Sequence, residues 1–487
     1  MSTSLPIYQA PEQDTEEKKE KCGVFAVWGT EHASRITYQG MYAQQHRGQE
    51  SAGMAVRRPD GKLHGHVDMG LVSRVFNPRM LDETLAGNAA IGHVRYSTTG
   101  ASEKCNAQPL LLKYHLGQVA VAHNGNLVNG ELLRRQYEEH GHIFQTATDT
   151  EVIVHLLAKP SHISKGDALP HVLRHLQGSY SLCFLFPDRI EAARDPWGIR
   201  PLSLGRLPGG QWVVASETCA FDAVSAEFVR DVKPGEIVRL DDEGMSSRRF
   251  SEPAKRRAHC IFEHVYFANP ASRLYGDNVH IARQRMGREL ARESGIDADL
   301  VIPMPDSGRS AALGYAKASG IEFDEGIVVN RFVGRTFILP DQKSREDAVK
   351  LKLNVIEDLI AGKRVVVVDD SIVRGTTTRA KMRALRSAGA AEIHLRISCP
   401  PIRHPCFYGI NFATKEELIA HNRTVDEIRD FLEVDTLAYL SLGGLIKSTN
   451  LPGKHCCTAC WSGEYKVPVD EPTARFNFDR DQLPMFK

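Results

Sequence analysis

The pattern of apolar and polar positions changes character about halfway along the chain. From residue 22 to about residue 250, short apolar runs of strand length follow one another, and helical patterns are few. A charged passage rich in Ser and Arg at 241–258 then fits a domain connection. The expected strands are 22–28, 89–95, 119–123, 181–186 and 212–216, and the expected helices are 34–45 and 151–158.

Beyond this passage, apolar strands alternate with segments of helical length, which is typical of βαβ units and a parallel sheet. Because 487 residues exceed what one hydrophobic core organises, the two patterns predict two domains of different class. The expected helices here are 281–294 and 309–318, and the expected strands are 300–304, 326–330 and 365–368.

One stretch of the second part carries a chemical signal. Four consecutive valines at 365–368 indicate a strand buried on both faces, and Asp369 and Asp370 follow at its carboxyl end, where open α/β sheets bind ligands. The small-residue loop from Ser371 to Thr377 opens a helix and presents N–H groups that suit a phosphate. Two carboxylates beside it suit sugar hydroxyls and Mg²⁺. The stretch predicts a sugar-phosphate site; the alternative is a plain strand, turn and helix.

Composition narrows the function classes. The chain has 61 Lys plus Arg against 60 Asp plus Glu, a net charge of +1, so nothing predicts binding to nucleic acid or a membrane surface. Apolar residues make up 42%, and no run approaches a membrane span of about 20 residues. The charged segment 1–21 resembles neither a secretory signal nor a transit peptide, so we expect a cytoplasmic protein. In that compartment the ten cysteines are expected as ligands, nucleophiles or buried thiols.

Cys22 opens the first strand after a polar segment that lacks periodicity. If residues 1–21 were removed as a propeptide, its own α-amine, with a pKa of about 7.7–8.0, could take the thiol proton. The alternative is a buried structural cysteine.

Three further segments favour a nucleophile. Arg95 ends a strand and could hold a carboxylate bidentately. Asn124 and Gly125 are expected in a turn that ends another strand, where an amide and an N–H can form an oxyanion hole. Asp149 lies at a helix start, where it could bind an ammonium group. Their alternatives are a surface ion pair, a hairpin turn and a helix cap, respectively.

Together these motifs resemble the class II glutamine amidotransferases. The matching segments are Cys-Gly-Val-Phe at 22–25, His-Arg-Gly-Gln-Glu-Ser-Ala-Gly at 46–53, His-Val-Arg-Tyr-Ser-Thr at 93–98 and His-Asn-Gly-Asn-Leu at 123–127. The resemblance implies an α+β N-terminal-nucleophile fold, an αββα sandwich, in which Cys22 attacks glutamine with its α-amine as base. His93 and His123 are interpreted as structural. The implied oxyanion donors are Asn124 and Gly125, and the implied glutamine-binding residues are Arg95, Thr98 and Asp149.

The stretch 365–378 resembles the phosphoribosyl-pyrophosphate (PRPP) motif of type I phosphoribosyltransferases, which implies an α/β domain. In this resemblance Ser307, Asp369 and Asp370 bind Mg²⁺, one ion per subunit. A basic loop at 330–352 would close over pyrophosphate and exclude water. The implied PRPP-binding residues are Asp369, Asp370, Ser371, Ile372, Val373, Arg374, Gly375, Thr376, Thr377, Arg331 and Arg335.

Four cysteines remain as a metal candidate. Cys457 and Cys460 form a Cys-x-x-Cys pair, next to Cys456, whereas Cys260 and Cys406 are isolated. Spacing alone leaves zinc and an iron–sulfur cluster open. A glutaminase followed by a phosphoribosyltransferase resembles the amidophosphoribosyltransferase family, and its iron–sulfur-bearing bacterial type matches at Cys260, Cys406, Cys457 and Cys460. The resemblance therefore implies one 4Fe–4S cluster per subunit with a structural role.

The resemblance implies transfer of glutamine-derived ammonia to PRPP, giving 5-phosphoribosylamine, glutamate and pyrophosphate, the first step of de novo purine synthesis. It also implies inhibition by purine nucleotides and a homotetramer, without nucleic-acid or membrane partners. The alternatives are another class II amidotransferase and a non-catalytic sensor of PRPP or nucleotides. The expected domains are a cleaved propeptide at 1–21, the glutaminase at 22–250, the phosphoribosyltransferase at 251–465 and a tail at 466–487.

Overall fold

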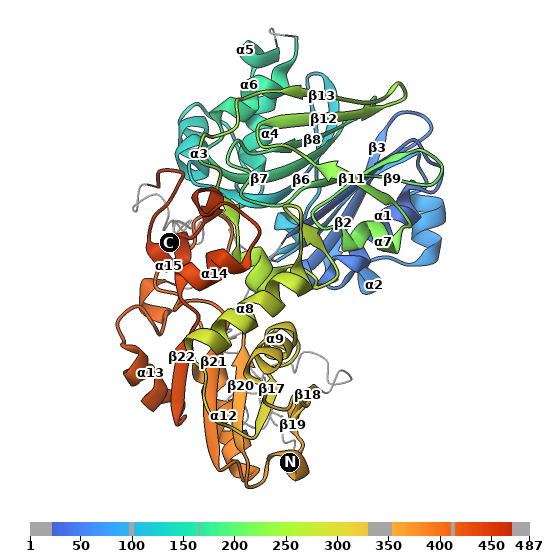
Figure 1. Cartoon of the computed structure of the whole chain (residues 1–487). Coiled ribbons are helices and arrows are strands. Elements are labelled where there is room, and N and C mark those ends of the chain that lie inside the picture. The colour runs from blue at the N-terminus through green and yellow to red at the C-terminus, as the bar shows by residue number, and fades with distance from the viewer. Residues whose placement is uncertain (1–21, 97–101, 164–165, 330–352, 411–413, 470–487) are drawn as a thin grey trace, which may run out of the picture. The chain divides into compact units, whose positions relative to one another are not determined.

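The computed structural model describes residues 22–96, 102–163, 166–329, 353–410 and 414–469. They form two compact units, which are described separately (Figure 1). Among the described residues, the larger unit takes 22–280, 405–410 and 449–469, and the smaller unit takes 281–404 and 414–448. The larger unit therefore includes two segments from the C-terminal part of the chain, and sequence order alone does not indicate this grouping.

The larger unit is built on two antiparallel sheets packed face to face. The first has the order β11-β9-β10-β1-β4-β2-β3 and the second the order β13-β12-β8-β7-β6-β5. The strands of the first sheet are β1 (Gly23–Trp28), β2 (Ser51–Arg57), β3 (Leu63–Met69), β4 (Ala89–Arg95), β9 (Ser203–Arg206), β10 (Trp212–Ala215) and β11 (Glu227–Asp231). Those of the second are β5 (Leu110–Tyr114), β6 (Gly117–Leu127), β7 (Gly178–Leu185), β8 (Ile190–Arg194), β12 (Glu236–Asp241) and β13 (Gly244–Arg249).

Helices cover the outer face of each sheet. The residues of β1 show how the layers form, because successive side chains of a strand point to opposite faces. Val24 and Ala26 pack against the second sheet, whereas Phe25 and Val27 pack against the helices. The outer helices of the first sheet are α1 (Ala33–Ala43), α2 (Val72–Val75) and α7 (Cys219–Ala223); those near the second are α3 (Gly130–Glu139), α4 (Thr150–Ala158), α5 (Pro160–Ile163) and α6 (Ala168–His175). The αββα sandwich expected from the sequence is confirmed.

The smaller unit contains a parallel sheet of order β17-β20-β21-β22. The four valines of β20 have no exposed surface, which confirms the strand buried on both faces. Its strands are β17 (Leu300–Pro303), β20 (Arg364–Asp369), β21 (Glu392–Ile397) and β22 (Thr436–Tyr439). Its helices are α9 (Arg309–Ser319), α11 (Glu357–Ile360), α12 (Thr376–Ser387), α13 (Val425–Leu432) and α14 (Leu442–Ser448), with α8 (Val279–Glu293) beginning at the unit boundary.

Two expectations about strands were wrong. The polar passage at 241–258 is not simply a connection, because Gly244–Arg249 forms β13 at the edge of the second sheet, a position that tolerates polar side chains. The strand expected at 326–330 does not join the parallel sheet. Ile327–Val329 (β18) pairs antiparallel with Leu353–Val355 (β19) in a separate ribbon. An apolar run predicts a strand, but it does not identify the strand's partner.

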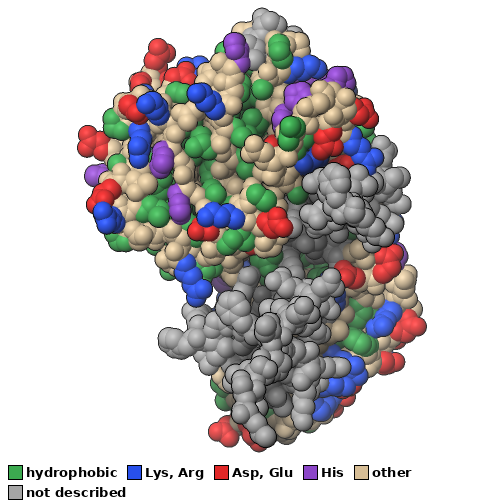
Figure 2. Space-filling model, turned by 180° about the vertical axis from the view of Figure 1, so that it is seen from behind, with side chains coloured by type: hydrophobic (Ala, Val, Ile, Leu, Met, Phe, Trp, Pro, Cys, Tyr) green, Lys and Arg blue, Asp and Glu red, His purple; other side chains and the backbone are tan. Residues whose placement is uncertain are grey.

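Short elements complete the described chain, and charge is spread over its surface. Figure 2 shows Lys and Arg interspersed with Asp and Glu on the visible face of the larger unit, in keeping with the balanced composition. None of the described helices is long and apolar enough to cross a bilayer. The short elements are η1 (Gln45–Arg47), η2 (Met80–Thr84), η3 (Lys104–Asn106), β14 (His259–Cys260), η4 (Glu263–Phe267), β15 (Arg273–Leu274), β16 (Asp277–Asn278), η5 (Lys415–Glu417), η6 (Gly453–His455), β23 (Cys456–Cys457) and α15 (Ala459–Ser462).

Replacing Gly287 by Ala should destabilise the smaller unit. A Cβ there would lie 1.9 Å from the Ala311 carbonyl oxygen, and one at Gly314 would lie 2.1 Å from that of Gln284, so α8 and α9 meet through glycines. We expect a loss of about 1–3 kcal/mol from overpacking, despite the better helix propensity of Ala. Amide hydrogen exchange in α8 and α9 measures it. The exposed Lys317→Ala on α9 is the control, and equal exchange in both variants would contradict the close crossing.

Candidate active sites

Cys22 precedes β1, a central strand of the first sheet of the larger unit. Its residue is 7% exposed, and its thiol lies 3.6 Å from the Tyr96 carbonyl oxygen, to which it donates. The guanidinium of Arg47 donates to the Cys22 carbonyl oxygen at 2.8 Å. Burial raises the pKa of the Cys22 thiol, so the neutral form is favoured and a base is needed to produce the thiolate.

Asn124 and Gly125 lie within β6, opposite Ser181 and Tyr180 of β7. The expected turn at this point was therefore wrong, because the strand continues to Leu127. Gly125 has φ +155°, and a Cβ there would lie 2.0 Å from the Ser179 carbonyl oxygen, so this stretch of strand requires a glycine.

One serine connects Asn124 with β1. The Asn124 amide nitrogen donates to the Ser216 hydroxyl oxygen at 3.2 Å, and the same oxygen accepts from the Val24 N–H at 3.0 Å. Ser216 thus holds the Asn124 side chain of the second sheet next to β1, the strand that directly follows Cys22. Asn124 is 2% exposed, which leaves its amide in a site largely closed to water.

Arg95 is buried at the end of β4 and forms an ion pair with Glu50, with 2.5 Å between Nη1 and Oε1. The alternative of a surface ion pair is therefore wrong. Asp149 precedes α4 but does not cap it through its side chain. Its carboxylate accepts from the Leu127 N–H at 2.8 Å and lies 3.6 Å from Nδ1 of His123. Thr98 lies outside the described residues.

Opposing effects set the charge of Asp149. Burial favours the neutral carboxyl, but His123 and the hydrogen bonds to the carboxylate outweigh burial and lower the pKa of Asp149 below its ordinary value. Asp149 therefore stays negative at neutral pH, as a group that binds ammonium must.

In the smaller unit, polar side chains converge where β17 and β20 end. Asp369 is the last residue of β20, and its Oδ1 accepts from the Asp370 N–H at 2.7 Å. The Ser371 hydroxyl donates to Oδ1 of Asp370 at 2.5 Å, and the Ser307 hydroxyl donates to Oδ2. Ser307 therefore meets Asp370, with Asp369 adjoining it, while the binding of Mg²⁺ and PRPP at this place stays a prediction.

The loop after Asp370 leads into α12. Gly375 has φ +84° and immediately precedes the helix, a conformation that favours glycine. The Val373 carbonyl oxygen accepts from the Ile419 N–H at 2.9 Å, and Arg374 pairs with Glu417 at 3.1 Å. These contacts hold a loop of backbone N–H groups at the amino end of a helix of 12 residues. Arg331 and Arg335 lie outside the described residues.

Four cysteines line one enclosed pocket of the larger unit, and none of them forms a disulfide. β14 and β23 pair in parallel with Cys260 opposite Cys457, which brings two distant segments together. Cys456 does not line the pocket, and its thiol lies 3.8 Å from the Pro452 carbonyl oxygen. Adjacent residues of a strand point to opposite sides, so only Cys457 of this pair faces the pocket. The four cysteines are Cys260, Cys406, Cys457 and Cys460.

The four cysteines that line this pocket suit a metal ion or metal cluster that is bound by thiolates. Ile199, Phe262 and Ile410 contribute apolar walls, and the Tyr408 N–H points to the Cys406 sulfur at 3.4 Å. Burial raises the pKa of Cys260 to about 12, and a cation would reverse this effect by stabilising the thiolate. Apolar surroundings and N–H donors to sulfur are features of iron–sulfur sites.

Comparison with known proteins agrees with this geometry. Residues 93–223 match the family described as a glutamine amidotransferase domain. The chain is 48% identical over 460 residues to the amidophosphoribosyltransferase of Bacillus subtilis, covering 93% of this chain and 96% of the relative. The relative from Methanothermobacter thermautotrophicus is also 48% identical, covering 94% and 97%. The chain belongs to the amidophosphoribosyltransferase family.

Solved structures support the same membership. Glutamine PRPP amidotransferase from B. subtilis, complexed with ADP and GMP, matches with a TM-score of 0.86 and 47% identity, covering 92% of this chain and 98% of that one. A structure described as the allosteric regulatory enzyme of purine biosynthesis matches with a TM-score of 0.88 and 47% identity, covering 93% and 97%. The expected enzyme activity, amidophosphoribosyl transfer in the first step of purine synthesis, is confirmed.

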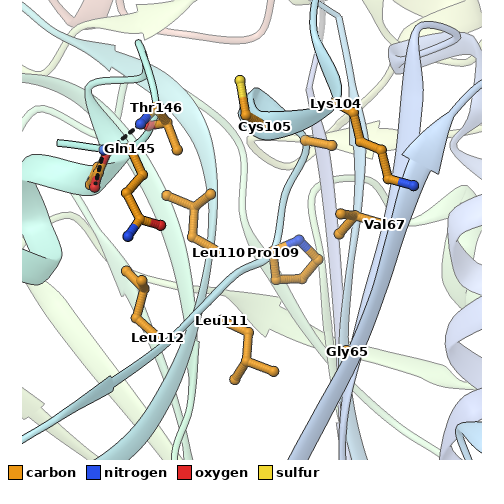
Figure 3. Close-up of a pocket in the computed structure, with 12 residues that line it drawn as sticks. Gly65, Val67, Lys104, Cys105, Pro109, Leu110, Leu111, Leu112, Gln145 and Thr146 are labelled. Atoms are coloured by element: carbon orange, nitrogen blue, oxygen red, sulfur yellow. Dashed lines mark hydrogen bonds between the residues drawn. The ribbon is translucent and has the colours of Figure 1, made fainter.

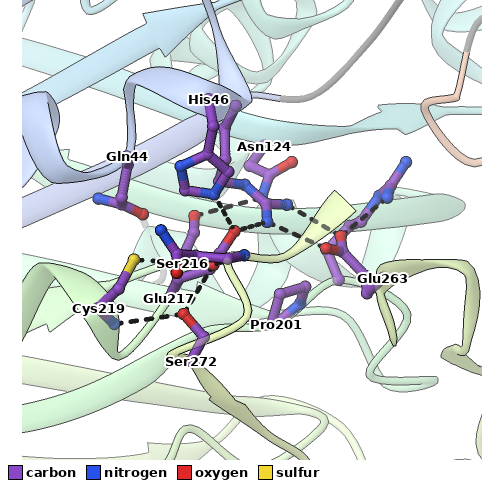
Figure 4. Close-up of polar contacts among 12 residues, drawn as sticks. Gln44, His46, Asn124, Pro201, Ser216, Glu217, Cys219, Glu263 and Ser272 are labelled. Carbon is purple, nitrogen blue, oxygen red and sulfur yellow. Dashed lines mark hydrogen bonds and ion pairs between the residues drawn. The ribbon is translucent and has the colours of Figure 1, made fainter. Parts of the chain in front are cut away.

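A buried ionic network in this family member was not predicted. Glu217 pairs with His46 and Arg47, and Glu263 pairs with Arg47 and Arg200. Figure 4 shows Glu217 between His46 and Ser272, whose hydroxyl donates to it at 2.8 Å. The residues of this network lie in motifs that are visible in the sequence, but only the fold shows that their four separate segments meet.

In this network, each charged side chain favours the ionised form of its oppositely charged partner. Burial opposes the charge of Arg47, but Glu263 and Glu217 outweigh burial and raise the pKa of Arg47 above its ordinary value. Burial also opposes the charge of Glu263, but Arg47 and Arg200 lower the pKa of Glu263. Arg47 and Glu263 therefore stay charged inside the protein.

A second pocket lies between β3, β5 and the segment before α4, with a volume of about 270 Å³. Figure 3 shows the apolar side chains of Leu110, Leu111 and Leu112 toward it, with Lys104 and Gln145 near its margin. Its lining contains none of the predicted site residues.

Replacing His93 by Gln should make the free energy of unfolding less dependent on pH. Burial lowers the pKa of His93 to about 3, so the folded histidine stays neutral, while the unfolded one binds a proton below pH of about 6.5. Stability is therefore lost as pH falls below 6.5. The glutamine of the variant cannot titrate, so the loss between pH 7 and 5 should shrink by about 2 kcal/mol.

Urea unfolding followed by tryptophan fluorescence measures this change, because all four tryptophans lie in the larger unit. The exposed His115→Gln should behave as the parent does. An unchanged pH dependence in His93→Gln would show that His93 does not carry the effect.

Proposed function

We propose that Cys22, freed by removal of residues 1–21, is the nucleophile of a glutaminase that supplies ammonia to PRPP. Its Sγ attacks the side-chain amide carbon of glutamine while its α-amine takes the thiol proton. The α-ammonium passes this proton to the amide nitrogen, which leaves as ammonia, and water then hydrolyses the thioester to glutamate and restores the thiol. The observation that carries the proposal is a buried thiol at the head of the central strand, where Val24 of that strand and the Asn124 amide share the Ser216 hydroxyl. The leader 1–21 lies outside the described residues.

The other glutaminase roles follow the family motifs. Asn124 and the Gly125 N–H stabilise the oxyanion, for which a closed polar site is effective. Arg95 holds the substrate carboxylate and Asp149 its ammonium group, with Thr98 nearby. The buried Arg95 and the negatively charged Asp149 support these assignments.

In the smaller unit, Asp369 and Asp370 bind the ribose hydroxyls of PRPP, and both with Ser307 hold one Mg²⁺ per subunit. The residues Ser371, Ile372, Val373, Arg374, Gly375, Thr376 and Thr377 cradle the 5-phosphate. Arg331 and Arg335 close over pyrophosphate. Ammonia attacks the anomeric carbon, and pyrophosphate leaves with the bonding electrons, which gives 5-phosphoribosylamine. The contact of Ser307 with Asp370 supports the metal site.

The four-cysteine pocket holds one 4Fe–4S cluster per subunit, of the iron–sulfur-bearing bacterial type. The cluster supplies four metal–sulfur bonds that join the segments of Cys260, Cys406, Cys457 and Cys460. The role is structural, because the four ligands come from three separate segments of the chain. The convergence of four thiols outside any disulfide supports this assignment, and zinc is the alternative for the same donor set.

The chain is also proposed to act as a cytoplasmic homotetramer inhibited by purine nucleotides. Support for the nucleotide inhibition comes from the B. subtilis relative, whose structure was solved with ADP and GMP; the cytoplasmic location and the homotetramer follow the resemblance described above.

Cys22→Ala should abolish glutamine-dependent pyrophosphate release and leave the ammonia-dependent reaction, because only the first requires the thiol.

Asp369→Asn should remove both PRPP-dependent reactions and spare at most a weak basal glutaminase. Assays of pyrophosphate and glutamate, with intact mass of the parent, measure these effects. A mature chain that retains residues 1–21, or loss of both activities in Cys22→Ala, would contradict the two-site assignment.

Cys457→Ser should reduce bound iron and acid-labile sulfide strongly, whereas the matched Cys456→Ser should retain both. The reason is that only Cys457 of the two lines the pocket. Metal analysis and visible absorbance of purified proteins decide the matter. Four-thiolate zinc without sulfide would refute the cluster, and equal losses in both variants would refute the ligand assignment.

A further inference from the structure

A continuous series of hydrogen bonds connects the four-cysteine pocket with the Cys22 carbonyl. The Tyr408 N–H points to the Cys406 sulfur at 3.4 Å, and the Tyr408 carbonyl oxygen accepts from Nε of Arg200 at 3.2 Å. Nη1 of Arg200 donates to Oε1 of Glu263 at 3.0 Å. Every member lies in the larger unit.

The series continues to the proposed nucleophile. Arg47 donates to both carboxylate oxygens of Glu263, at 2.9 and 3.0 Å, and its Nε donates to the Cys22 carbonyl oxygen at 2.8 Å. Arg47, Arg200 and Glu263 are at most 2% exposed, so water does not weaken these contacts. A guanidinium fork fixes both the distance and the direction of each pair.

The same cysteine-bearing segment also touches the proposed oxyanion strand. The Asn126 amide donates to the Phe407 carbonyl oxygen at 3.0 Å. A Cβ at Gly409 would lie 3.0 Å from the Gly125 carbonyl carbon, so the two backbones are in close contact. A shift of residues 406–409 would therefore move both the ion-pair series and β6.

We propose that Arg200 is a positioning residue that couples the four-cysteine site to the glutaminase site through Glu263 and Arg47. With the proposed cluster bound, the four cysteines are thiolates and would give the pocket negative charge, and Arg200 lines that pocket. A change of charge in the pocket therefore alters how strongly Arg200 interacts with the pocket and with Glu263. Because Glu263 binds Arg47, and Arg47 binds the Cys22 carbonyl, this change also shifts the Cys22 backbone. This inference builds on the proposed cluster, and it concerns glutamine use alone.

The experiment measures alkylation of Cys22 by iodoacetamide, with peptide mapping by mass spectrometry, in protein kept anaerobically oxidised or reduced with dithionite. In the parent we expect the two alkylation rates to differ, because reduction adds one negative charge beside Arg200. Arg200→Met should abolish this difference. Arg200→Lys should keep the metal content but lower the glutamine kcat/KM on the order of 10- to 100-fold through misplacement of Cys22. The ammonia-dependent reaction should remain unchanged.

Two matched variants separate coupling from general damage. Glu217→Gln removes a partner of Arg47 that does not line the pocket, so alkylation should slow while its redox dependence remains. Arg194→Lys alters another buried arginine, which donates to backbone carbonyls of residues 198, 200 and 232, and should leave the redox dependence intact. Tryptophan fluorescence reports folding of each variant.

Equal alkylation rates in oxidised and reduced parent protein would overturn the proposal, as would a redox difference that survives in Arg200→Met. Absence of iron would refute the proposed cluster instead. In that case the Arg200→Lys effect on Cys22 alkylation still decides the link: a slower rate supports it, and an unchanged rate overturns it.

Discussion

Four charged side chains are buried together in the larger unit, and their need for partners constrains how its segments meet. Arg47, Arg200, Glu217 and Glu263 come from four separate segments and are almost completely inaccessible to water. Leaving one such charge without its partner costs about 3–5 kcal/mol, so the segments are held in one arrangement. The Cys22 carbonyl lies at the edge of this arrangement, which places the start of β1 under the same constraint.

The smaller unit depends on a different constraint. Parallel strands end at one edge of their sheet, so residues that follow β17 and β20 converge although about 60 positions separate them. Asp369 and Asp370 meet Ser307 for this reason, and the Gly375 conformation turns the chain into α12 beside them. The two halves thus position chemistry by different means: paired buried charges in one, and strand ends with a helix start in the other.

The sequence predicted the fold where local pattern and burial coincide. The valines of β20 and the apolar run of β1 are buried on both faces, and α1, α4 and α9 lie within a few residues of their expected bounds. Prediction failed where partners decide the structure. Asn124-Gly125 has the composition of a turn but lies mid-strand, and 244–249 has the composition of a connection but forms an edge strand. For Asp149 it was the helix-cap alternative that was wrong, because its carboxylate accepts from the Leu127 N–H of a neighbouring strand.

The sequence by itself determined the chemical groups: a cysteine at the head of a strand, an Asp pair before a phosphate loop, and four cysteines in three segments. These are local features, set by side-chain type and order. Only the tertiary structure decided which groups meet. It brings residues 405–410 and 449–469 onto the larger unit and joins four charged segments into one network. The reason is physical: a buried charge requires a partner, and in this network the partners lie far apart along the chain.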